Sequence, residues 1–264
     1  MERPIISVVP GQAPVAAAPT KARDGASRSP TPLYIVCSVR RGVGKTLLAR
    51  LLTEFHLING RQVAAFDLAD EEPQLADYLP RCTTIGDISD TLGQMALFDR
   101  LVADDRSAKV VDLSHRLFKD FFLVAQKIGL FEEARRCAVE PLIFFVIDPS
   151  SKSSQGYAIL RRWFPDASLL PVRNRIVGKG IPSRYAPPNA RASPGSFEIS
   201  MLDSSLRALV DRPLFSFADF WQTTPVHLSA RVNDELRTWM EEIFRQFREV
   251  ERRLMCEEIL SSLE

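Results

Sequence analysis

The chain has 264 residues, of which 45% are hydrophobic and 25% are charged, and its formal net charge is +1 at pH 7. This length allows one or two domains, and we favour one α/β domain with a substantial core. Because the net charge is near zero, the chain as a whole has no positive field that would attract nucleic acid or anionic lipid. No apolar run approaches the roughly 20 residues of a membrane span. The four cysteines lack metal-binding or redox spacing, so we expect reduced thiols in a cytoplasmic protein.

The N-terminal segment, residues 1–32, holds six of the 18 prolines together with many small and polar residues. Such a composition buries too little apolar surface to offset the entropy of ordering, so we expect a disordered tail. The tail is mildly basic and could bind a partner, although a solvated extension is the favoured interpretation. Residues 33–264 are expected to form a single folded domain.

A strand, a glycine-containing turn and a helix follow one another between Leu33 and Arg50. Gly42 and Gly44 let the backbone turn tightly and point successive N–H groups inward, while the helix that begins near Lys45 adds the positive end of its dipole. Lys45 would contact the β and γ phosphates, and the Thr46 hydroxyl would complete the shell of a Mg²⁺ ion. The stretch therefore predicts a phosphate-binding loop.

The loop reads Arg40-Arg41-Gly42-Val43-Gly44-Lys45-Thr46 and resembles the deviant Walker A box of the ParA/MinD family of P-loop ATPases, usually Lys-Gly-Gly-Val-Gly-Lys-Thr. In that family the first lysine reaches across a nucleotide-sandwich dimer to the partner's phosphates, and Arg40 stands at its position. Arg41 replaces a glycine and adds a bulky side chain where two subunits would meet. The resemblance implies ATP binding by residues 41–46 and a trans contact by Arg40, whose planar fork differs from an ammonium group.

A second strand, Gln62 to Asp67, leads into a run of acids that resembles the family's second box, usually Asp-x-Asp-Pro-Gln. The resemblance assigns Asp67 to the first acid, which holds a Mg²⁺-bound water. The second acid, which orients the attacking water, is assigned to Asp70. One extra residue separates the acids here, so Glu71 and Glu72 stay open as alternatives.

Two more strands end at the expected carboxyl edge of the sheet. Ala108 to Asp112 has the Walker B pattern, in which Asp112 supports the water shell of the metal. His115 follows and is expected to be a polar loop residue. Pro141 to Ile147 is the most continuous apolar run, as expected at the centre of a parallel sheet. Between them, Leu117 to Arg136 predicts one long helix.

The fifth strand, Ser168 to Val172, leads to Asn174, where ParA/MinD-like proteins place an Asn whose amide can pair with the adenine edge. A plain turn residue is the alternative. Seven basic residues lie nearby and could contact non-specific DNA or form a solvated loop; they are Arg161, Arg162, Arg173, Arg175, Lys179, Arg184 and Arg191.

The C-terminal segment, residues 232–260, carries its large apolar side chains on one stripe and predicts a long amphipathic helix. Its last residues are acidic, and acids repel anionic lipid, so stable membrane binding is not expected. We expect the helix to pack against the domain or against a partner helix.

Strand and helix alternation predicts a three-layer, doubly wound and mostly parallel sheet of the P-loop NTPase type, with the ligand at its carboxyl edge. The resemblance to the ParA/MinD family implies the leading hypothesis, an ATP-dependent switch that forms a homodimer around ATP and Mg²⁺, hydrolyses slowly, and serves partitioning, positioning or plasmid transfer and stability. A non-hydrolysing nucleotide-binding scaffold that acts through a protein partner is the alternative. A metabolic phosphate-transfer enzyme is a third option, without a supporting substrate motif.

Overall fold

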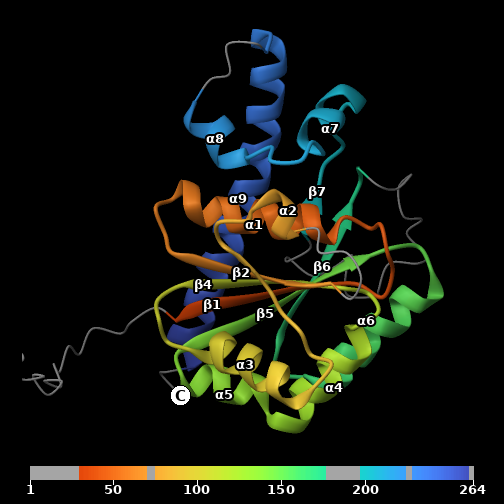
Figure 1. Ribbon diagram of the computed structural model, residues 1–264, viewed down its shortest axis with the longest axis vertical. Coiled ribbons are helices and arrows are strands. Elements are labelled where there is room, and N and C mark those ends of the chain that lie inside the picture. Colours follow the sequence, from red (N-terminus) through yellow and green to blue (C-terminus); the bar gives the residue numbers. More distant parts are fainter. Residues whose placement is uncertain (1–29, 70–74, 177–196, 224–227, 262–264) are drawn as a thin grey trace, which may run out of the picture.

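The computed structural model describes residues 30–69, 75–176, 197–223 and 228–261, except for the side chains of Met255 and residues 257–261. Within these residues the chain forms one seven-stranded sheet in the order β3-β2-β4-β1-β5-β6-β7, with all neighbouring strands parallel (Figure 1). The strands are β1 (Thr31–Cys37), β2 (Val63–Leu68), β3 (Thr83–Ile85), β4 (Ala108–Leu113), β5 (Val139–Ile147), β6 (Ser168–Asn174) and β7 (Phe197–Ile199).

Helices cover both faces of this sheet, which confirms the predicted three-layer fold. In Figure 1 one helical layer lies above the strands and the other below them, and each layer packs on its own apolar cluster. The upper layer contains α1 (Lys45–Ile58), α2 (Leu75–Tyr78), α7 (Ser204–Val210) and α8 (Phe217–Gln222). Helix α9 (Ala230–Ser261) packs on the same apolar cluster but extends from above the strands to below them. The lower layer contains α3 (Thr91–Val102), α4 (Phe118–Ile128), α5 (Leu130–Arg136) and α6 (Ser151–Trp163).

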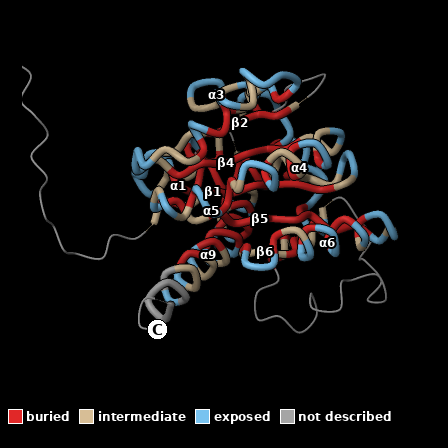
Figure 2. The backbone as a smooth tube through the Cα atoms, turned by 90° about the horizontal axis from the view of Figure 1, so that it is seen from below, coloured by how far each residue is buried: buried red, intermediate tan, exposed pale blue. Residues whose placement is uncertain are grey.

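Strand β1 lies at the centre of the sheet, between β4 and β5. Its residues from Leu33 to Cys37 are almost completely buried, because helices cover alternate side chains on both faces. Figure 2 shows this burial along the strands, with exposed residues on the outer sides of the helices. Because β2, β4 and β1 are parallel neighbours, the loops that follow these strands lie together at the carboxyl edge of the sheet.

Most predicted strands differ from the structure by one or two residues at an end, and two further boundaries differ in kind. Residues 117–136 do not form one helix: α4 ends at Ile128, its cap Gly129 has a φ of 63° in the left-handed region that favours glycine, and α5 begins at Leu130. Strand β1 begins at Thr31, inside the segment expected to be a tail. Residues 1–29 lie outside the described part of the chain.

The C-terminal helix α9 packs on the domain along its buried apolar stripe. It also covers the edge strand β7: the Gln246 side chain accepts from the backbone N–H of Glu198 at 2.9 Å and donates to its carbonyl at 2.8 Å. Trp239 Nε1 donates to the carbonyl of Ser200 at 3.1 Å. These contacts satisfy backbone groups that an open sheet edge would leave exposed. In the described residues no helix has the length and hydropathy needed to span a bilayer.

The C-terminal half of α9 is anchored to the domain by a polar cluster around Glu251. Its Oε1 accepts from the Tyr34 hydroxyl at 3.2 Å and from Arg61 Nη1 at 2.5 Å. His56 Nε2 lies 3.8 Å from the same oxygen, and the His56 side chain is 1% exposed. Burial lowers the pKa of His56 to about 3, and Arg61 adds to the effect, so His56 is neutral at pH 7 and does not form an ion pair.

His56 should therefore make stability depend on pH. The unfolded side chain titrates near 6.5 and the folded one near 3, so the unfolded state binds more protons and the stabilisation, complete above 6.5, is lost as pH falls. Between about pH 6 and pH 5 the free energy of unfolding should drop by about 1 kcal/mol more in the wild type than in His56→Gln. Urea denaturation at several pH values measures both slopes, and equal slopes would refute this assignment.

Candidate functional site

A cavity of about 420 Å³ opens at the carboxyl edge of the sheet, where the loop after β1 meets the ends of β2 and β4. Its other wall is formed by Tyr78 of α2, Arg207 of α7 and Asp211, the residue that follows α7. The phosphate-loop residues Gly42, Gly44, Lys45 and Thr46 line it together with the two strand-end acids, Asp67 and Asp112. Residues predicted from separate motifs therefore share one site.

The glycine loop has the backbone that its sequence predicts. Gly42 and Gly44 have φ values of 73° and 93°, in the left-handed region where a side chain would introduce strain. Helix α1 begins directly afterwards at Lys45. Lys45 Nζ donates to the carbonyl of Arg40 at 3.2 Å, which closes the loop on itself. Burial lowers the pKa of Lys45, while nearby Asp112 opposes this shift.

The two acids, Asp67 and Asp112, lie opposite each other in the register of β2 and β4. Burial raises the pKa of Asp112 to about 6 and the negative Asp67 adds to this, whereas a hydrogen bond from Thr46 and the charge of Lys45 lower it. Two carboxylates and one hydroxyl are the oxygen ligands that Mg²⁺ prefers. In the described residues no group of three His, Cys, Asp or Glu is placed to hold a metal ion. A Mg²⁺ ion at Asp67 and Asp112 would keep several waters and take phosphate oxygens of a nucleotide as further ligands.

The predicted water-orienting acid, Asp70, lies outside the described residues, as do its alternatives Glu71 and Glu72. The described part of the chain continues at α2, where the N–H of Ala76 donates to Asp67 Oδ2 at 3.1 Å. Asp67 is thus connected to α2, which follows this segment in the chain.

Asn174 is the last residue of β6 and contacts the glycine loop itself. Its Nδ2 donates to the carbonyl of Val43 at 3.0 Å, and its Oδ1 accepts from the N–H of Ile176 at 3.0 Å. The amide nitrogen therefore holds the glycine loop, while the amide oxygen holds the turn that follows β6. Pairing of Asn174 with a nucleobase stays a prediction.

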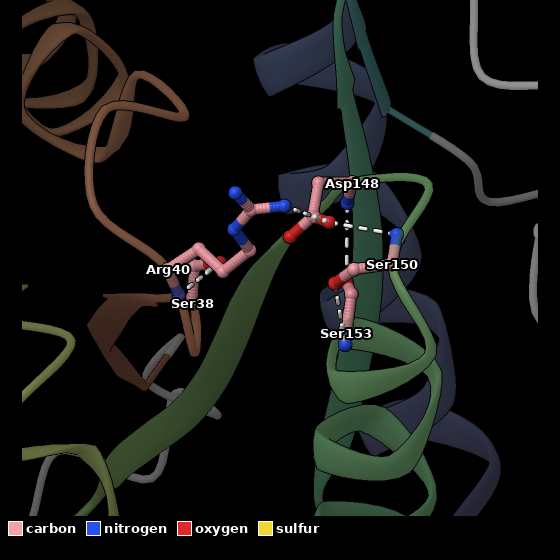
Figure 3. A network of polar contacts seen from close by, with 5 residues as sticks. All are labelled: Ser38, Arg40, Asp148, Ser150 and Ser153. Atoms are coloured by element: carbon pink, nitrogen blue, oxygen red, sulfur yellow. Dashed lines mark hydrogen bonds and ion pairs between the residues drawn. The ribbon is translucent and has the colours of Figure 1, made fainter.

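The two arginines that open the loop point in different directions. Arg41 lines the cavity. The Arg40 guanidinium instead lies 3.5 Å from Asp148 Oδ1, just after β5 (Figure 3). Asp148 is held by the N–H of Ser150, which donates to its Oδ1 at 2.8 Å, and its own N–H donates to Ser153 Oγ at 3.1 Å. Arg40 is thus paired within its own subunit, and its predicted trans contact is untested.

The structure describes only part of the predicted basic segment. Lys179, Arg184 and Arg191 lie outside the described residues. Arg161 and Arg162 are exposed on α6, whereas Arg175 is paired with Glu198 at 2.8 Å. Contact with DNA stays a prediction.

Sequence reasoning missed several cavity residues, above all Arg50, Tyr78, Arg116 and Arg207. Arg50 had a usable signal, because it lies four residues after Thr46 on the same side of the helix, among the apolar positions and one turn before a second charge, Glu54. The others come from segments with no motif, and only the fold brings them to the cavity.

Comparisons with known proteins give similarity at the level of structure alone. No family model and no curated protein matches the sequence. The structure resembles a nucleotide-binding protein from Archaeoglobus fulgidus in complex with ADP, at TM-score 0.44 and 16% identity over 68% of this chain and 85% of that one. It also resembles a ParA family ATPase from Chlorobium tepidum, at TM-score 0.46 and 12% identity over 81% and 98%.

A third similar structure is the cell division protein FtsY from Thermotoga maritima, at TM-score 0.38 and 18% identity over 57% of this chain and 54% of that one. The chain therefore spans about half of that protein. The assignment of the site depends on its own geometry: a parallel sheet with a glycine loop between its central strand and α1 is the P-loop nucleotide-binding fold.

Proposed function

We propose that this protein binds ATP with Mg²⁺ at the loop from Gly42 to Thr46 and works as a ParA/MinD-like switch. The observation that carries the proposal is the placement of this loop, with its two left-handed glycines, opposite the paired carboxylates of Asp67 and Asp112. A positive loop facing two acids suits a triphosphate bound with a divalent cation.

Each group has a distinct task in this proposal. The loop amides and the N-terminus of α1 hold the phosphates, and Lys45 exchanges its bond with the Arg40 carbonyl for one with a phosphate oxygen. Thr46, Asp67 and Asp112 hold the metal and its waters. The metal, when bound, would neutralise charge on the phosphates. Asp70 would orient the attacking water.

The proposed homodimer requires Arg40 to leave Asp148 and reach the phosphates of a second subunit. The Arg40 side chain is 54% exposed, and its contact with Asp148 is long at 3.5 Å, so the guanidinium can reach solvent. Its departure would leave the Asp148 carboxylate, which is 9% exposed, without this cation, and contacts in the dimer must outweigh that cost. Nucleotide binding would favour the released state only if the guanidinium gains phosphate contacts there.

Arg40→Ala should abolish ATP-dependent dimerisation while the monomer still binds ATP, because the substitution removes the cation that would cross the interface and leaves the glycines, Lys45 and Thr46 of the loop in place. Analytical ultracentrifugation with and without a non-hydrolysable ATP analogue measures the dimer. Arg162→Ala, which removes an exposed arginine from α6, is the matched control. Undiminished dimerisation of Arg40→Ala would dismiss the trans role.

A non-hydrolysing scaffold is the second candidate. It is favoured by the pairing of Arg40 within its own subunit and by the position of Arg41 in the cavity, where it would crowd a second subunit. Steady-state ATP turnover separates the two functions. A slow rate that is lost in Asp70→Ala supports the switch, whereas nucleotide binding without any turnover supports the scaffold.

A further inference from the structure

The cavity has a buried cation, Arg50, that the predicted roles do not use. Arg50 is 2% exposed and lies on α1, one turn after Thr46. Its Nη1 donates to the carbonyl of Val210 at 2.9 Å and its Nη2 to the carbonyl of Phe215 at 2.8 Å. These two carbonyls flank the connection between α7 and α8. The guanidinium is therefore fixed in place by two backbone contacts.

Arg50 is also enclosed by two aromatic rings. Its guanidinium carbon lies 3.8 Å from the centre of the Tyr78 ring and 4.9 Å from that of Phe217. A guanidinium desolvated against aromatic faces is held by a cation–π attraction that is stronger than the same contact in water. The Tyr78 hydroxyl additionally donates to the carbonyl of Asp211 at 3.2 Å. Tyr78 is thus held at its ring and at its hydroxyl.

Tyr78 is the last residue of α2, and the beginning of α2 contacts the acidic wall of the cavity. The helix has only four residues, Leu75–Tyr78, so its two ends cannot move independently. The N–H of Ala76 donates to Asp67 Oδ2 at 3.1 Å, as described above. A continuous series of contacts therefore runs from Arg50 through Tyr78 and α2 to the carboxylate of Asp67.

We propose that Arg50 and Tyr78 are positioning residues, which fix α2 and thereby aim the Asp67 carboxylate at the metal that accompanies the nucleotide. The inference rests on the proposed function, since it concerns the same site. Outer contacts that orient a metal-supporting carboxylate commonly contribute about 10-fold or more to metal affinity. Neither residue needs to touch the metal for this effect.

The test is the gain in nucleotide affinity that Mg²⁺ provides, measured by titrating a fluorescent ATP analogue with excess Mg²⁺ and with EDTA. A loss of general stability would lower the affinity for the analogue equally in Mg²⁺ and in EDTA. A displaced Asp67 would lower mainly the affinity in Mg²⁺, and so the ratio of the two affinities. Tyr78→Leu removes the ring and the hydroxyl, and Arg50→Lys keeps the charge but loses the two-pronged donor. We expect each to reduce the Mg²⁺ gain by about 10-fold, and Tyr78→Phe, which keeps the ring, to reduce it less.

Arg237→Lys is the matched control. Arg237 on α9 makes the same kind of contacts away from the cavity: its guanidinium carbon lies 5.7 Å from the Phe220 and Trp221 ring centres, and its Nη2 donates to the Trp221 carbonyl at 3.2 Å. This variant should keep the wild-type Mg²⁺ gain. Should Arg50→Lys not fold, Tyr78→Leu decides alone, because Tyr78 is only partly buried.

The outcomes separate the two proposals. A folded Tyr78→Leu protein with the full Mg²⁺ gain overturns the positioning role and leaves nucleotide binding standing. Wild-type protein that binds the analogue equally well in Mg²⁺ and EDTA also overturns it. Wild-type protein that binds no nucleotide in either condition overturns the proposed function itself.

Discussion

Lys45→Ala should lose about 100-fold in affinity for ATP, because it deletes a positive charge at the start of α1 that lines the proposed phosphate site. Lys45 is the only lysine among the described residues that line the cavity, and burial already lowers its pKa, so the ammonium gains by meeting an anion. Isothermal titration calorimetry with ATP and Mg²⁺ measures the loss.

The matched control is Lys119→Ala, which removes an exposed lysine from α4 on the opposite face of the sheet. Both variants carry the same change in net charge, so an effect of global charge would appear in both. Equal affinities of the two variants would contradict a role for Lys45 in phosphate binding.

Phe247→Ala should lower the free energy of unfolding by about 3–5 kcal/mol, the usual result of truncating a buried aromatic side chain. The Phe247 side chain, on α9, is 2% exposed. Its ring stacks on Phe197 of β7 at a centroid distance of 4.9 Å and contacts Phe55 of α1 at 5.4 Å. The C-terminal helix thereby joins the sheet edge to the helix that follows the phosphate loop.

Denaturant unfolding measures this loss, with Arg248→Ala on the exposed side of the same helix as the control. We expect the control to stay within about 0.5 kcal/mol of the wild type. A similarly small effect of Phe247→Ala would mean that α9 is not part of the domain core.

The sheet was predictable because its strands are apolar on both faces, a pattern that hydropathy makes visible. The run from Pro141 to Ile147 lies within β5, and the acids at the ends of β2 and β4 mark where those strands stop. The single-helix prediction over 117–136 failed because the apolar pattern continues through Gly129. Only the glycine signals the break, and its φ depends on the packing of both helices.

The phosphate loop was predictable for a different reason: its glycines, lysine and threonine are adjacent in sequence, so one short motif contains the geometry. Asn174 shows the limit of such reasoning. Its place after the fifth predicted strand was visible in the sequence, but its contact with Val43 joins residues 131 positions apart and depends on the placement of β6. The pairing of Arg40 with Asp148 spans 108 residues and was likewise not predictable.

A crystal structure with a non-hydrolysable ATP analogue and Mg²⁺ tests the central claim most directly. We expect the β and γ phosphates within hydrogen-bonding distance of the amides from Gly42 to Thr46, with the metal between Thr46 and the two carboxylates. An empty loop at saturating nucleotide, or a triphosphate bound elsewhere on the protein, would contradict the account.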